Sequence, residues 1–135
     1  MVLLGYNTIY HKGIIPVNDA KTTINDLKAS VKKFTEDREW EKYHSPKNLS
    51  MALAAEAAEL MELFLWVESK DSYDELEKRR EEAEYEIADV AILVLAFCVR
   101  HNIDLSDAIA RKQVEAARKY PIEKAKGNHL KYNQF

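Results

Sequence analysis

The sequence predicts an all-α protein built as a four-helix bundle. Apolar residues recur at helical spacing, three and four positions apart, in four segments separated by short connections. Three Gly and three Pro among 135 residues are too few for a turn-rich β-sandwich or a glycine-rich phosphate loop. With 47% apolar and 32% charged residues, the chain can bury a core and solvate its outside, as one ordered domain.

The first predicted helix covers residues 23–41, where apolar residues at helical spacing are separated by charges. The residues before it, 1–22, have no clean period and are predicted to form an irregular arm. Ser45-Pro46 is typical of an N-cap followed by proline at the first helical position, where its missing N–H costs nothing. We expect the second helix to run from there to about Ser69.

The third helix is expected to open with a capping box at Ser72–Glu75 and to continue to about Arg100. Because this is long for a globular helix, a kink is expected between its charged half, residues 74–86, and its apolar half. The fourth helix runs from the N-cap Asp104 to Lys119 and is stopped by the proline that follows shortly after.

Apolar residues on more than one side of the third helix predict that a second subunit covers it, in a homodimer or a homotetramer. The single Cys98 lies in an apolar run, so we expect a buried, inert thiol and a reducing, cytoplasmic compartment. The start of the chain is a poor signal peptide, and the longest apolar run, 87–99, is too short to span a bilayer. A net charge of −3 offers no cationic surface, so neither nucleic acid nor a membrane is an expected partner.

Four carboxylates occupy apolar helix faces. Glu56 interrupts an apolar stripe on the second helix, and Glu59, three residues on, projects toward the same volume. Glu86 and Asp89 repeat this spacing on the third helix. One such acid alone would more simply be a salt-bridged surface residue, but two facing pairs would repel unless a cation held them. Oxygen ligands without Cys or paired His favour Mg²⁺ or Mn²⁺, so the four acids predict a divalent-metal site.

A ferritin-like di-iron centre is the competing metal site. It requires two Glu-x-x-His pairs on inward helix faces. Only Glu41-x-x-His44 has this spacing, and it lies at the frayed end of a helix beside Pro46. One pair is not sufficient for a di-iron centre.

The acidic motifs and their flanks resemble the all-α nucleoside triphosphate pyrophosphohydrolases of the MazG-like superfamily, in particular the dCTP pyrophosphatase branch. The superfamily pattern is E-x-x-E, a spacer and E-x-x-D, which here reads Glu56-Ala-Ala-Glu59, 26 residues, and Glu86-Ile-Ala-Asp89. The flanking motifs are Asp37-Arg-Glu-Trp40, His44-Ser-Pro-Lys-Asn48-Leu, Glu59-Leu-Met-Glu-Leu-Phe-Leu-Trp66 and Arg118-Lys-Tyr-Pro-Ile-Glu-Lys-Ala-Lys-Gly127. The resemblance covers residues 25–127, so a catalytic domain is expected over 23–127 and a C-terminal tail over 128–135.

This resemblance implies hydrolysis of a nucleoside triphosphate, such as dCTP or a related pyrimidine nucleotide, to the monophosphate and pyrophosphate. It implies that all four acids bind Mg²⁺ and that Glu59, or else Glu56, acts on the attacking water. It also implies base stacking by the two tryptophans and phosphate contacts from the basic residues. The expected substrate-binding residues are Trp40, His44, Asn48, Trp66, Lys112, Arg118 and Tyr120.

One position departs from the pattern: Ala116 stands where relatives commonly carry an Asn of the substrate site, which leaves the base preference open. Two alternatives remain at this stage. One is a phosphoribosyl-ATP pyrophosphohydrolase of the same superfamily, against which Trp40, Trp66 and the Lys-Tyr-Pro segment argue. The other is a helical interaction module without turnover.

Overall fold

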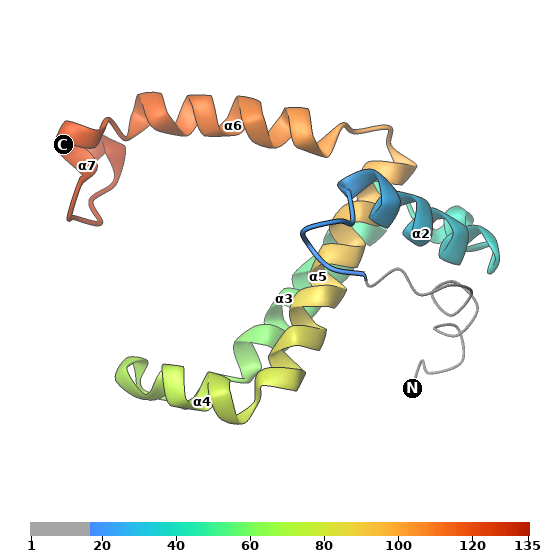
Figure 1. Cartoon of the computed structure of the whole chain (residues 1–135), viewed down its shortest axis with the longest axis horizontal. Helices are drawn as coiled ribbons and strands as arrows, with labels where there is room; N and C mark the ends of the chain where they lie inside the picture. The colour runs from blue at the N-terminus through green and yellow to red at the C-terminus, as the bar shows by residue number, and fades with distance from the viewer. Residues whose placement is uncertain (1–16) are drawn as a thin grey trace. The chain divides into compact units, whose positions relative to one another are not determined.

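The computed structural model describes residues 17–135, and all regular structure within them is helical (Figure 1), which confirms the all-α class. The chain divides into two units, Met1–Asn102 and Ile103–Phe135, which are described separately. Residues 1–16 of the predicted arm lie outside the described residues. The first unit contains α2 (Ile24–Glu36), the 3₁₀ turn η1 (Trp40–Tyr43), α3 (Pro46–Glu62), η2 (Ser69–Asp71), α4 (Ser72–Lys78) and α5 (Arg80–Arg100). The second contains α6 (Leu105–Lys119), α7 (Ile122–Ala125) and η3 (Tyr132–Gln134).

Local caps start the helices where the sequence predicts them. The Ser45 hydroxyl accepts a hydrogen bond from the Asn48 backbone N–H at 3.2 Å, so Ser45 caps α3. Asp104 caps α6 in the same way, accepting from the Asp107 N–H at 3.0 Å. Both predicted N-caps are confirmed.

The predicted capping box at Ser72–Glu75 is wrong. Ser72 is the first residue of α4, and its hydroxyl donates to the Ser69 carbonyl at 2.7 Å. The 3₁₀ turn Ser69–Asp71 leads directly into α4, so Ser72 already has helical backbone angles, whereas an N-cap residue requires extended ones.

The first helix ends at Glu36, earlier than the predicted residue 41. Nη1 of Arg38 donates to the Phe34 carbonyl at 3.0 Å, and this carbonyl is the acceptor that the Arg38 backbone N–H would use in a continuing helix. The backbone N–H groups of Arg38 and Glu39 turn instead to carbonyls three residues back. Glu39 then takes left-handed backbone angles, φ 53° and ψ 37°, and η1 begins.

The second helix ends at Glu62 rather than near residue 69. The backbone N–H groups of Phe64 and Leu65 bond to carbonyls three residues back, Met61 at 3.1 Å and Glu62 at 3.4 Å. Nη1 of Arg79 donates to the Leu63 carbonyl at 3.2 Å. In a continuing helix that carbonyl would accept from the Val67 N–H, which here bonds to the Phe64 carbonyl at 3.1 Å. The residues that follow α3 therefore form tight turns.

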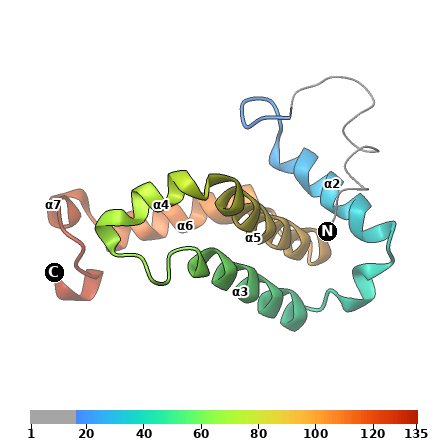
Figure 2. The ribbon, with the colours of Figure 1, turned by 90° about the horizontal axis from the view of Figure 1, so that it is seen from below.

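The expected kink between the charged and apolar halves of the third helix is wrong in its position, because the helix breaks inside the charged half and α5 continues unbroken past residue 86. Arg79 separates α4 from α5 with φ −115° and ψ 29°, and its guanidinium also pairs with Glu82 at 2.6 Å. After the kink α5 runs antiparallel to α3 and packs along it (Figure 2). α2 packs against α5 as well.

Apolar side chains from α2, α3 and α5 form the core of the first unit. Leu49 is only 2% exposed, and Cys98 is a buried free thiol, as expected. The buried apolar residues are Val31, Leu49, Leu63, Ala83, Leu95, Ala96 and Cys98. No helix among residues 17–135 has the length and hydropathy needed to cross a bilayer.

In the second unit, the residues expected as a tail fold back on the end of α6. Gly127 has φ 77°, a left-handed conformation that suits glycine, and the chain turns there. The ring of Tyr120, the C-cap residue of α6, meets Tyr132 at 6.1 Å and Phe135 at 6.0 Å, edge to face. Residues 128–135 therefore pack against Tyr120.

We expect Arg79→Ala to lower the melting temperature by about 5 °C, because the Leu63 carbonyl and Glu82 both lose their donor. The matched control is Arg80→Ala, which removes only exposed ion pairs with Glu77 and Glu84 and is expected to shift it by less than about 2 °C. Circular-dichroism melts in one buffer compare the two variants. Equal shifts would contradict a special role for Arg79.

Candidate functional site

Three carboxylates from two helices meet in the first unit, and we call Glu56, Glu86 and Asp89 the acidic cluster. One oxygen from each residue lies within 4.8 Å of the other two. α3 supplies Glu56, and α5 supplies Glu86 and Asp89 one turn apart. Glu56 and Glu86 are half-buried, while Asp89 is exposed. The antiparallel packing of α3 and α5 thus brings three of the four predicted metal ligands together.

The cluster concentrates negative charge. Burial raises the pKa of Glu56 above its ordinary value, and the charges of Glu59, Asp89 and Glu86 raise it further. The pKa of Glu86 is also raised, again by burial first and then by the charges of Glu59 and Asp89. Without a counter-charge, the folded protein therefore resists ionisation of these groups.

The fourth predicted ligand, Glu59, lies beside the acidic cluster. Its carboxylate is exposed and is not one of the three whose oxygens lie within 4.8 Å of one another. Its charge nevertheless acts on both Glu56 and Glu86. Glu59 therefore adds to the negative charge that the cluster experiences.

The donor set of the acidic cluster suits a hard divalent cation. All three donors are carboxylate oxygens, and among residues 17–135 no histidine or cysteine joins them. Glu41 and His44, the pair with di-iron spacing, belong to η1 and its C-cap and lie outside the cluster. The oxygen-only set fits Mg²⁺ or Mn²⁺ better than zinc or a di-iron centre.

Three predicted substrate residues lie on η1 and the start of α3. Trp40 is 44% exposed, and its ring meets Phe34 edge to face at 5.7 Å. His44 is half-buried at the end of η1. The Asn48 amide donates to the Tyr43 carbonyl at 2.9 Å, so this side chain fastens the turn between η1 and α3.

Trp66 lies in the turns after α3, not on a helix as the sequence predicts. Its side chain is 92% exposed, and no ring among residues 17–135 stacks on it. Trp66 lies beyond the end of α3 at Glu62, so no helix carries it. A tryptophan in this position is available to a ligand or to another chain.

The remaining predicted substrate residues belong to the second unit. Nζ of Lys112 contacts Glu115 at 2.7 Å, and Nζ of Lys119 contacts the same carboxylate at 2.5 Å. Hydrogen bonds from these two lysines lower the pKa of Glu115 to about 2. Ala116, the next residue after Glu115, has only a methyl side chain.

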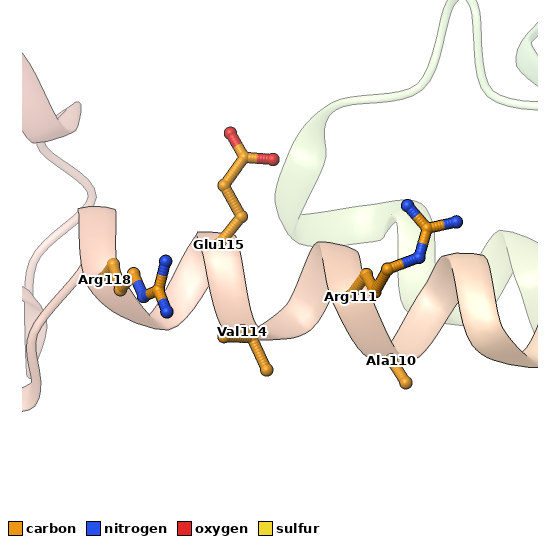
Figure 3. A pocket seen from close by; sticks show the side chains of 5 residues that line it. All are labelled: Ala110, Arg111, Val114, Glu115 and Arg118. Atoms are coloured by element: carbon orange, nitrogen blue, oxygen red, sulfur yellow. The ribbon is translucent and has the colours of Figure 1, made fainter.

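Arg118 lines a shallow hollow on the surface of α6 (Figure 3). Figure 3 shows Arg111 and Glu115 on one side of the helix and Val114 on the other. The residues around the hollow are Ala110, Arg111, Val114, Glu115 and Arg118, and none of them belongs to the acidic cluster. The basic side chains of α6 and the carboxylates of α3 and α5 are thus supplied by separate units.

Arg38 makes contacts that its sequence context does not predict. Its guanidinium carbon lies 3.6 Å from the ring centroid of Phe34 and 5.9 Å from that of Trp40. The signal available in the sequence was its position four residues after one aromatic residue and two before the other. That spacing predicts a shared contact only once α2 is known to end between the two aromatic residues.

Comparison with known proteins agrees with the fold and with the motifs. The profile of the MazG-like family matches residues 51–135. The chain is 32% identical over 118 residues to "dCTP pyrophosphatase 1" of Bos taurus, covering 86% of this chain and 70% of that protein. It is 33% identical over 115 residues to the Homo sapiens protein of the same name, covering 84% and 68%.

A solved structure gives the same result. The crystal structure of a pyrophosphatase from Archaeoglobus fulgidus superposes with a TM-score of 0.71 at 37% sequence identity. The match covers 81% of this chain and 99% of that one. With the acidic motifs in place and the family profile matching more than half of its length, this chain belongs to the MazG-like family, in the branch that resembles the dCTP pyrophosphatases.

Proposed function

We propose that this protein is a Mg²⁺-dependent nucleoside triphosphate pyrophosphohydrolase. Its substrate in this proposal is dCTP or a related pyrimidine nucleotide, which it cleaves between the α and β phosphates to the monophosphate and pyrophosphate. The observation that carries the proposal is the acidic cluster, formed by facing carboxylates of α3 and α5. Family membership and relatives named for dCTP support the reaction class. We place the catalytic domain over residues 23–127.

The acidic cluster would hold the cation, with Mn²⁺ as a possible substitute for Mg²⁺. When bound, the ion neutralises charge that develops on the phosphoryl group and orients the polyphosphate. Glu59 is the proposed general base, because its exposed carboxylate lies beside the cluster without belonging to it and can accept a proton from water. Glu56 is the second candidate for that role.

The nucleoside end of the substrate requires a flat surface and hydrogen bonds. We assign base stacking to Trp40 and Trp66, both of which present exposed indole surface. His44 and Asn48 would contribute polar contacts from the turn that follows Trp40. Lys112 and Arg118 of the second unit are the proposed contacts to the phosphates, and Tyr120 is the remaining proposed substrate-binding residue.

We also propose that the protein works as a homodimer or homotetramer. α3 and the turns after it expose Met51, Met61, Leu65 and Trp66, and α5 exposes Tyr85, Ile87 and Ile92, each by 45% or more. Such a concentration of exposed apolar side chains on two paired helices is typical of a surface that a second copy covers. The single buried Cys98 accords with a reducing compartment, which we take to be the cytoplasm.

Incubation with a panel of nucleoside triphosphates and Mg²⁺ should release monophosphate and pyrophosphate, with pyrimidine deoxynucleotides preferred. Asp89→Asn should reduce turnover by about 100-fold or more while the helical circular-dichroism spectrum is kept, because the variant loses one cluster charge. Product separation by anion-exchange chromatography measures both results.

The matched control is Glu84→Gln, an exposed acid of α5 outside the acidic cluster, which should retain turnover within about twofold. Release of orthophosphate in place of pyrophosphate would contradict the cleavage position. Full turnover by Asp89→Asn would reject the assignment of the site, whereas a natural chain that hydrolyses none of the triphosphates would favour a helical interaction module.

Removing one cluster charge should stabilise the metal-free protein. The pKa of Glu56 is raised above its ordinary value of 4.5 in the folded state. Ionised Glu56 therefore destabilises the folded protein. This destabilisation is absent below pH 4.5, grows as the pH rises from there through the raised pKa, and persists above it. Glu56→Gln should therefore melt higher than the natural chain at about pH 7 without divalent cations, and the difference should vanish near about pH 4.

Added Mg²⁺ should reverse this order, because it stabilises the chain that binds it more tightly. Differential scanning fluorimetry with EDTA and with Mg²⁺ makes the comparison. Glu123→Gln, an exposed acid on α7, serves as the control and should change neither melt. An equal Mg²⁺ response in the natural chain and in Glu56→Gln would contradict the assignment of Glu56 as a ligand.

The natural chain should elute with about two or four times its 15.6 kDa mass, and Ile87→Arg should shift it toward the monomer because a charge then lies on the covered face. Light scattering coupled to size exclusion measures the mass. Ile122→Arg, on α7 and 75% exposed, is the control that should leave the mass unchanged. A monomeric natural chain would contradict the proposed oligomer.

A further inference from the structure

The guanidinium of Arg38 lies against two aromatic rings at the end of α2. Its carbon is 3.6 Å from the ring centroid of Phe34, a stacking distance, and 5.9 Å from that of Trp40. The two rings also meet each other edge to face, 5.7 Å apart at 77°. Arg38, Phe34 and Trp40 therefore form one contact cluster, which we call the arginine-aromatic cluster.

The carboxylates next to Arg38 in the sequence form ion pairs with lysines and not with Arg38. Glu36 pairs with Lys32 at 3.6 Å, and Asp37 pairs with Lys33 at 2.9 Å. Glu39 is within 4.0 Å of Lys42. Each of the three acids next to Arg38 thus has a lysine, and no carboxylate of residues 17–135 forms an ion pair with Arg38.

Two further restraints hold the guanidinium in place. Nη1 donates to the Phe34 carbonyl at 3.0 Å, which fixes the fork relative to the last turn of α2. Glu39 holds left-handed backbone angles that are unusual for a residue with a side chain, and this turn brings Trp40 back toward Phe34. The cluster is therefore built by the turn and not by chance contact of two long side chains.

We propose that Arg38 is a positioning residue for nucleobase binding, acting through Trp40; this inference rests on the proposed function. Trp40 belongs to a four-residue 3₁₀ turn and is 44% exposed, so its ring would sample several rotamers without support. Contact with the guanidinium and with Phe34 fixes the indole before substrate arrives. The ordering entropy is then already lost in the free enzyme, and the base binds more tightly.

Steady-state kinetics with dCTP and Mg²⁺ test this role. Arg38→Met keeps the aliphatic stem and removes the guanidinium, and it should raise KM about tenfold while kcat stays within about twofold. Arg38→Lys keeps the charge without the planar fork and should raise KM by about threefold. Lys32→Ala, the matched loss of a positive charge on α2 away from both rings, should leave KM unchanged.

Two measurements separate positioning from a general structural effect. In a double-mutant cycle, Arg38→Met should change KM by less than about twofold when Trp40 is already Ala, because the partner it acts through is gone. Inhibition by inorganic tripolyphosphate, which has no base, should be the same in the natural chain and in Arg38→Met. Additive effects in the cycle, a fall in kcat at constant KM, or weakened tripolyphosphate inhibition would overturn the proposal.

A third measurement does not depend on the reaction. With Trp66→Phe as the background, Trp40 is the sole source of indole fluorescence. Arg38→Met should then raise acrylamide quenching of Trp40 by about twofold, because a released ring is more accessible. Unchanged quenching would overturn the positioning role even in an active enzyme, whereas raised quenching in a chain that hydrolyses no nucleotide would reject the proposed function alone.

Discussion

The hydrogen bond from the Arg79 guanidinium to the Leu63 carbonyl couples the end of α3 to the start of α5. Leu63 is the C-cap residue of α3, and the same arginine marks the kink from which α5 departs. α5 then returns along α3, and this return places Glu86 and Asp89 opposite Glu56. The acidic cluster therefore depends on a contact between residues sixteen positions apart in the chain.

How far the fold could be predicted follows from the range of each interaction. The N-caps Ser45 and Asp104 act on residues three positions ahead, so the local sequence was sufficient to find them. The ends of α2 and α3 were predicted too late, because backbone N–H groups there bond to carbonyls three residues back, and the spacing of apolar residues does not report that change. The Ser72 cap failed because the preceding 3₁₀ turn had no sequence signal of its own.

The residues of the candidate site also differ in how far the sequence could predict them. Charged residues on an apolar helix face are costly, so their spacing predicted the carboxylates that meet in the acidic cluster. Exposed polar side chains choose among several nearby partners, and pattern alone does not reveal the choice. The bond from Asn48 to the Tyr43 carbonyl and the stacking of Arg38 on Phe34 are of this kind.

The lysines of α6 already form ion pairs with a carboxylate of the same helix. Glu115 accepts hydrogen bonds from Lys112 and Lys119, which lower its pKa to about 2, so its carboxylate is ionised at neutral pH. If Lys112 contacts phosphate as proposed, the incoming group exchanges with this internal anion and does not fill a vacant cationic patch. A monoanionic metabolite gains little binding free energy from such an exchange, because one negative charge replaces another. A ligand that carries several negative charges gains more, because its attraction to the lysines exceeds that of a single carboxylate.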